Sequence, residues 1–223
     1  MATTYKTFLS NDQASTRTML HEAIPVTGTI VSGTYDTSGT PENVKNYSHG
    51  MFQSVYDYPY LSSSANHIID ITTGYSATST ISHSAPAADG SSVDQQKKKI
   101  NIYNEMAQVL VGYNTSGSIQ EFDVDGDILA GGRKIKEAFF INFSRLLTKD
   151  EIKKGSFSMS FVTGGTSAAL AGGDLTIADT NAQNVYKVNS PAGEYSLLKV
   201  SSVQAAGRGH AVGDVVGQLY YQA

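Results

Sequence analysis

The chain has 223 residues, of which 40% are hydrophobic and only 16% are charged, and this apolar content is sufficient for a real core. Its net charge of −4 argues against nucleic acid as a main partner, because binding to phosphates requires a surplus of lysine and arginine on one face. The lack of cysteine excludes disulfides, cysteine-ligated zinc and thiol chemistry.

The first predicted helix lies near residues 11–24. Ser10 and Gln13 form an S-x-x-Q capping box, and Pro25 follows the last turn. From Val26 onward, β-branched residues alternate with glycine and serine, and the segment SANHIIDITTGYSATSTI continues that pattern. Such alternation is typical of strands that are joined by tight turns.

A second helix is predicted over residues 95–111, ending before Gly112. Its apolar residues recur at spacings of three and four, namely Ile100, Tyr103, Met106, Ala107 and Leu110. Three lysines in its first turn, Lys97, Lys98 and Lys99, oppose the helix dipole. Either the helix begins after them or a partner supplies acidic groups, so all three are candidate interface residues.

Asp123, Asp125 and Asp127 have the D-x-D-x-D spacing that begins an EF-hand calcium loop. The rest of that loop does not match, because its sixth position is Ile128 and its twelfth is Lys134. The three aspartates are therefore only weak candidates for a divalent-ion site, and no cofactor is expected. The segment is instead predicted to be a hairpin with a tight turn at Asp125–Gly126.

The rest of the chain is predicted to be β-rich, with one short helix at residues 149–154. That helix would lie between a T-x-x-E capping box and Gly155. The segment SFSMSFV, residues 156–162, alternates large apolar residues with serine as a half-buried strand does. We expect an α+β, β-dominant fold, an antiparallel sheet or sandwich flanked by two or three helices. Residues 1–162 would form the main domain, and 163–223 a glycine-rich β subdomain or assembly arm.

Aromatic side chains are concentrated between Tyr47 and Tyr75 and again at the end of the chain. A tyrosine can anchor a protein interface or stack on a sugar ring. Because the chain has no tryptophan, interface or core packing is favoured over glycan binding. The aromatic candidate interface residues are Tyr47, Phe52, Tyr56, Tyr58, Tyr60, Tyr75, Tyr220 and Tyr221.

No catalytic motif is found, and the chain is expected not to be an enzyme. The five histidines form no metal-binding pattern, and the G-x-S-x-G motif is absent. A hydrolase would require the fold to bring a histidine within hydrogen-bond reach of a serine and a carboxylate. The first residues do not match a secretory signal, and no apolar run reaches the roughly 20 residues of a membrane span. We therefore expect synthesis in a cytoplasm and no membrane partner.

Four long segments resemble virion structural proteins of tailed bacteriophages, particularly the contractile-tailed phages of marine cyanobacteria and their relatives. These segments are TRTMLHEAIPVTGTIVSGTY, NYSHGMFQSVYDYPYLSSSANHIIDITTGYS, KINIYNEMAQVLVGY and AFFINFSRLLTKDEIKKGSFSM. The resemblance covers residues 1 to about 162 and carries over no catalytic residue.

The resemblance implies a virion component, made in the host cytoplasm, whose partners are other copies of itself and other virion proteins. Tail or baseplate is the preferred place, and capsid decoration or neck is the next. A carbohydrate-binding adhesin module is the alternative from another functional class.

Overall fold

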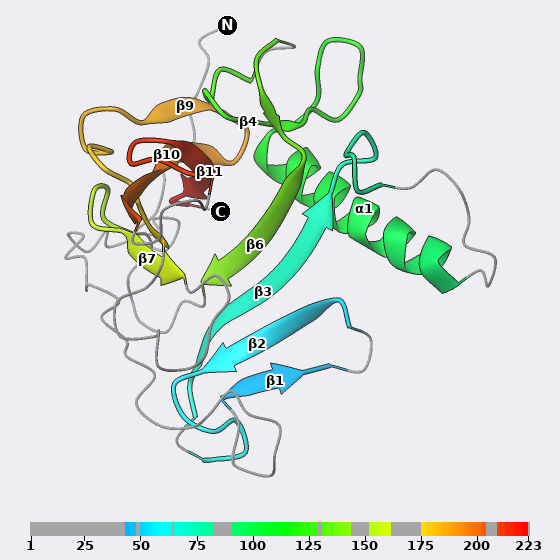
Figure 1. The fold of residues 1–223 in the computed structure, drawn as a ribbon, viewed down its shortest axis with the longest axis vertical. Coiled ribbons are helices and arrows are strands. Elements are labelled where there is room, and N and C mark those ends of the chain that lie inside the picture. Colours follow the sequence, from blue (N-terminus) through cyan, green and yellow to red (C-terminus); the bar gives the residue numbers. More distant parts are fainter. Residues whose placement is uncertain are drawn as a thin grey trace, which may run out of the picture.

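The structure is a computed structural model that describes residues 43–47, 50–63, 65–82, 91–128, 131–143, 152–161, 175–203 and 209–222. Within these ranges the fold consists of antiparallel sheets and one helix (Figure 1). The prediction of a β-dominant fold is thereby confirmed.

The first sheet has four strands in the order β1-β2-β3-β6. Their bounds are Val44–Asn46, Phe52–Tyr56, His67–Tyr75 and Glu137–Phe143. All three pairings are antiparallel, and directly opposed residues share one face of the sheet. One face therefore carries the row Val44, Val55, Ile69 and Phe143, while Thr72 and Phe140 lie on the other.

Helix α1, Ser91–Leu110, packs against β3 at Gly74 (Figure 1). A Cβ atom added to Gly74 would lie 2.8 Å from the backbone nitrogen of Tyr103 and 3.0 Å from the carbonyl oxygen of Lys99. Only glycine allows the helix backbone to approach the strand this closely. The helix ends at Leu110, one residue before its predicted end, and Gly112 follows with a φ of +87°, a conformation that favours glycine.

The apolar face of α1 forms a core with the two-stranded sheet of β4, Phe122–Asp123, and β5, Lys134–Ile135. Tyr103 is at the centre of this core and is 1% exposed. Its hydroxyl donates to the carbonyl oxygen of Ile135 at 2.6 Å and accepts from the backbone N–H of Phe122 at 3.2 Å. The spacing of three and four that predicted the helix therefore also identified its buried face.

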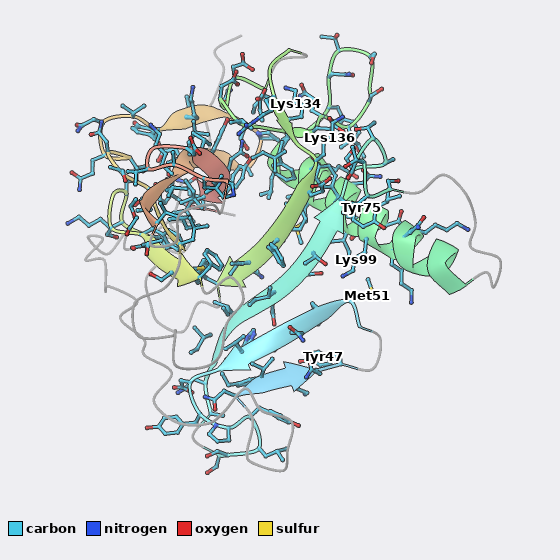
Figure 2. All side chains as sticks on the ribbon, in the orientation of Figure 1. Tyr47, Met51, Tyr75, Lys99, Lys134 and Lys136 are labelled. Atoms are coloured by element: carbon cyan, nitrogen blue, oxygen red, sulfur yellow. The ribbon has the colours of Figure 1, made fainter. Side chains whose placement is uncertain are left out.

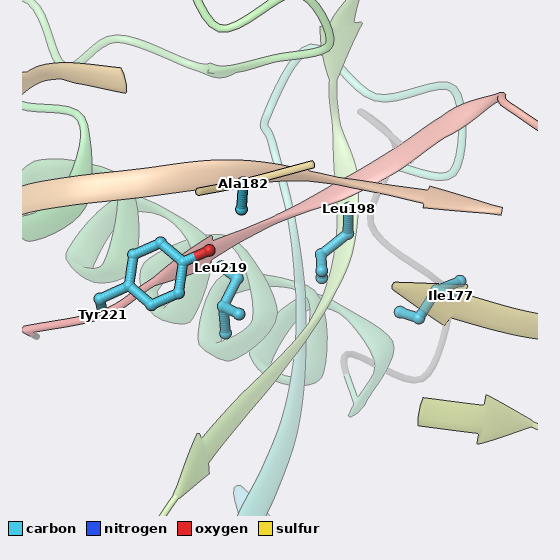
Figure 3. Packing of buried hydrophobic residues seen from close by; sticks show 5 residues of the cluster. All are labelled: Ile177, Ala182, Leu198, Leu219 and Tyr221. Carbon is cyan, nitrogen blue, oxygen red and sulfur yellow. The ribbon is translucent and has the colours of Figure 1, made fainter. Parts of the chain in front are cut away.

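The second sheet has the strand order β11-β10-β8-β7, and β9 also pairs with β10. In chain order the bounds are β7 Ser158–Phe161, β8 Leu175–Ala178, β9 Lys187–Ser190, β10 Gly193–Val203 and β11 Val215–Tyr220. The buried residues of its own core are Ile177, Ala182, Leu198, Leu219 and Tyr221 (Figure 3). The β7–β8 pairing joins segments on either side of residue 162, and the domain division there remains a prediction.

Only one of the predicted helices is present among the described residues. The helix near 11–24 lies outside them, and so do residues 149–151 of the short helix. Residues 152–154 of that helix are described and are not helical, which corrects the prediction. The reason is tertiary: the backbone N–H groups of Gly155 and Phe157 donate to the buried carboxylate of Asp179 and hold this segment in a turn.

Helix α1 begins at Ser91, four residues before its predicted start. Lys97 is therefore the seventh residue of the helix rather than a member of its first turn. The effect of the helix dipole is confined to the first turn, so the expected electrostatic conflict does not arise. The lysines no longer require an acidic partner on that ground.

Candidate functional site

Most of the predicted interface tyrosines between Tyr47 and Tyr75 lie around β1 and β2. The ring of Tyr47 contacts the ring of Phe52 at a centroid distance of 4.8 Å, and its hydroxyl lies 3.2 Å from Ser54 Oγ. Phe52 and Tyr58 are each 37% exposed, whereas Tyr47 is half-buried. The structure therefore brings Tyr47 and Phe52 together at the surface of the sheet.

Tyr56 and Tyr60 approach each other in the connection between β2 and β3, with centroids 6.3 Å apart. Both are half-buried. The connection is held at its base by Asp57, whose Oδ1 accepts from the backbone N–H groups of Tyr58 at 2.8 Å and Asn66 at 2.6 Å. Hydrogen bonds from Asn66, together with that from Tyr58, lower the pKa of Asp57. This closed loop presents Leu61, which is 86% exposed.

Tyr75 and the lysines lie at the other end of the sheet. Figure 2 shows Tyr75 and Lys99 near the junction of β3 and α1, far from Tyr47. Lys97 and Lys98 are exposed, and Lys99 is half-buried. The interface residues predicted in the first half thus divide into two separate groups.

Tyr220 and Tyr221, the predicted interface residues at the end of the chain, pack inside their own chain. Tyr220 stacks on Tyr195 with ring centroids 4.9 Å apart, and Tyr221 is 4% exposed. The Tyr221 hydroxyl donates to Asp179 Oδ2 at 2.8 Å and lies 2.7 Å from Ser196 Oγ. Tyr221 therefore belongs to the core of the second sheet, whereas Tyr220 packs against the core of α1 and β4.

A histidine, a carboxylate and a serine meet on the first sheet, but not in the order of a catalytic triad. Asp70 Oδ1 accepts from Ser54 Oγ at 2.5 Å and lies 2.8 Å from His67 Nε2. In a triad the imidazole stands between the serine and the carboxylate and takes the serine proton. Here the carboxylate is in the middle and the serine hydroxyl donates to it, so the arrangement provides no activated nucleophile.

The three aspartates of the EF-hand-like spacing do converge. One carboxylate oxygen from each of Asp123, Asp125 and Asp127 lies within 4.8 Å of the others. Asp123 is 1% exposed, and its Oδ2 lies 2.5 Å from Lys134 Nζ. Lys134, which occupies the twelfth position of the EF-hand-like spacing, therefore neutralises the buried carboxylate of the cluster. Burial raises the pKa of Asp123 in spite of Lys134, whereas the backbone N–H of Asp127 lowers the pKa of exposed Asp125.

The loop that carries these aspartates, residues 123–128, is called the acid loop below. It is not the predicted two-residue turn, because β4 ends at Asp123 and β5 begins only at Lys134. The second sheet fixes it instead: the Gly126 carbonyl accepts from the Tyr195 hydroxyl at 2.9 Å and from Asn189 Nδ2 at 3.0 Å. Gln218 Nε2 donates to the Asp123 carbonyl at 2.6 Å. Sequence reasoning missed Asn189, Tyr195 and Gln218, which carry no local signal.

Alkaline pH is expected to loosen the attachment of the acid loop. Tyr195 is fully buried, and burial raises its pKa from the ordinary value of 10.0 to about 12. An unfolded tyrosine ionises near pH 10, so this stabilisation is complete below that pH and is lost as the pH rises through about 12. The loss amounts to roughly 2 to 3 kcal/mol of unfolding free energy. Urea titrations at increasing pH, followed by tyrosinate absorbance, measure it.

Substituting Tyr195→Phe supplies the control for this measurement. The variant should be less stable at neutral pH and should show a shallower fall above about pH 10, because one ionising group is removed. If the tyrosines of the folded protein all ionise near pH 10 without unfolding, the burial effect is contradicted.

No protein-family model matches the chain, and neither does any curated protein or solved structure. Among the described residues, α1 does not combine the length and the apolar content that a membrane-crossing helix requires.

Proposed function

We propose that this chain is a non-enzymatic structural component of a bacteriophage virion that acts through contacts with other copies of itself and with other virion proteins. The resemblance of four long segments to virion proteins supports a place in the particle; tail or baseplate is the preferred place, and capsid decoration or the neck is the next. No cofactor and no catalytic residue enter the proposal.

The observation that carries the proposal is the exposed apolar side of β6. This strand ends the four-stranded sheet and, among the described residues, pairs only with β3. Its sequence EAFFINF has a single charged residue, Glu137, and no proline. Phe139, on the face opposite Gly74 and Phe140, is 74% exposed. Sheet-end strands with apolar side chains and few charges readily accept another chain, and free monomers normally protect them.

Locating the protein in particles tests the proposal. Mass spectrometry of gradient-purified virions should detect this chain in stoichiometric amount, and antibodies against it should label the tail or baseplate. Labelling of the capsid or neck would instead support a role in capsid decoration or in the neck. Absence from purified particles would contradict the proposal.

The carbohydrate-binding alternative rests on the exposed ring of Tyr58 and on the neighbouring pair of rings of Tyr56 and Tyr60 in the same connection, whose centroids lie 6.3 Å apart. Tyrosine rings can stack on the apolar face of a sugar. A glycan array probed with the purified chain decides between the two functions. Binding that is lost in the Tyr58→Ala variant, with assembly intact, would favour the adhesin.

Phe139→Ser is expected to weaken self-association at least tenfold. It removes an apolar ring whose contribution to the free energy of association is more than about 1.4 kcal/mol. The ring is largely in solvent, so the unfolding free energy should change by no more than about 0.5 kcal/mol. Light scattering across a dilution series measures association. Val212→Ser, at a position that is 65% exposed outside this strand, is the matched control and should associate like the wild type.

A further inference from the structure

A pocket of about 470 Å³ lies between the segment that follows α1 and the acid loop. Its wall combines one aromatic ring, two aliphatic side chains and five polar side chains. The apolar residues are Tyr113, Ile119 and Ile128, and the polar ones are Asn114, Thr115, Gln120, Glu121 and Lys134. The volume and the mixture of apolar surface with a few polar groups are those of a small-ligand pocket.

The pocket is held rigidly by its own backbone. Asn114 Oδ1 accepts from the N–H groups of Ser116 and Ser118, both at 2.9 Å, which closes the turn beside Tyr113. Ile128 has a φ of +60°, a conformation that β-branched residues rarely adopt. Such strain persists only where the surroundings fix it, and Ile128 packs against the core of α1 and β4.

Two acceptor atoms of the pocket wall have no donor among the described residues. Glu121 Oε1 accepts from the hydroxyls of Ser76 and Thr78, but Oε2 has no donor among the described residues. Gln120 uses its amide nitrogen on the carbonyl of Tyr113 at 3.1 Å, which leaves its amide oxygen without a donor in the same part of the chain. A ligand that satisfies these atoms must therefore be rich in hydrogen-bond donors.

The charges around the pocket favour a cation. Glu121 contributes a carboxylate to the wall, while the Lys134 ammonium in the same wall is already matched by Asp123 at 2.5 Å. Arg133, which is exposed, and half-buried Lys136 are the other cations on the adjoining β5 segment. The ring of Tyr113 is 52% exposed and can lie against a positive group. A planar guanidinium can stack on that ring while its separate N–H groups donate to Glu121 Oε2 and to the Gln120 amide oxygen, a combination that a compact ammonium cannot make.

We propose that this pocket receives the guanidinium of an arginine side chain from a neighbouring virion subunit, an assignment that rests on the function proposed above. Glu121 binds the guanidinium, Gln120 accepts one of its N–H groups, and Tyr113 covers its plane. The pocket is thus an anchoring point of the subunit contact, separate from the exposed side of β6.

Titrating the isotope-labelled full chain with N-acetyl-arginine methylamide, followed by NMR, tests the pocket. Resonances of Tyr113, Gln120 and Glu121 should shift and saturate. The neutral isostere N-acetyl-citrulline methylamide should bind roughly tenfold more weakly, because it lacks the charge. Glu121→Gln and Tyr113→Leu should each weaken arginine binding by a similar factor, whereas Tyr58→Leu, at another exposed tyrosine, should have no effect.

Equal binding of the arginine and citrulline compounds would overturn the proposal, as would stronger shifts with maltose, which would make the pocket a saccharide site. Absence of any shift with the arginine compound would overturn it as well. Because the titration uses the isolated chain, its failure is distinguishable from absence of the protein in virions. If the chain binds the arginine compound but is absent from purified virions, the guanidinium site is supported and the virion partner is refuted.

Discussion

Replacing Gly74 by alanine is expected to destabilise the protein by about 3 kcal/mol or more. The added methyl group would lie 2.8 Å from the backbone nitrogen of Tyr103 and 3.1 Å from the ring of Phe140. Neither the helix backbone nor the half-buried ring of Phe140 can move away without opening the core around Tyr103. Urea unfolding followed by circular dichroism measures the change, and α1 should lose protection from hydrogen exchange first.

Gly131→Ala provides the matched control, because nothing lies within 4 Å of its hypothetical Cβ and its φ is not positive. Its unfolding free energy should stay within about 0.5 kcal/mol of the wild type. If both variants are equally stable, α1 does not dock on β3 as described.

Asp179→Ala is expected to cost about 3 to 5 kcal/mol of unfolding free energy, because three donors, among them the buried Tyr221 hydroxyl, would lose a buried acceptor. Asp179 is 1% exposed and accepts from the backbone N–H of Gly155 at 2.7 Å, that of Phe157 at 2.9 Å and the Tyr221 hydroxyl at 2.8 Å. The carboxylate thereby connects the turn before β7 to the last residues of the chain. Thermal and urea unfolding measure the loss.

Asp214→Ala tests whether burial is the cause. Its carboxylate also accepts a backbone hydrogen bond, from Ala211 at 2.7 Å, but at an exposed position where water can replace it. The expected cost is about 0.5 to 1 kcal/mol. A similar loss in both variants would mean that the buried network around Asp179 contributes nothing beyond one ordinary hydrogen bond.

Two elements followed directly from local patterns. The spacing of apolar residues from Ile100 to Leu110 predicted α1 and its buried face, and Gly112 marked its end. The alternation in SFSMSFV predicted β7, which occupies Ser158–Phe161. In both cases the signal lies within one element, because a helix or a half-buried strand repeats its exposure every few residues.

The acid loop and the C-terminal tyrosines show where local reasoning failed. Asp125–Gly126 is a good hairpin dipeptide, but the carbonyl of Gly126 is bound by Tyr195, which is 69 residues away in the chain. Tyr221 looked like an exposed aromatic terminus, yet Asp179 and Ser196 satisfy its hydroxyl inside the core. In each case the deciding partner belongs to a different strand or turn.

The amino-acid sequence by itself determined the β-dominant character of the chain and the buried face of α1, because these depend on neighbours a few residues apart. The tertiary structure alone decided that Lys134 pairs with Asp123, that Asp179 binds the backbone of Gly155 and Phe157, and that Gly74 is the contact point of helix and sheet. Those outcomes depend on burial and hydrogen bonding between segments that are distant in the sequence. Such contacts produce no periodic pattern in the local sequence.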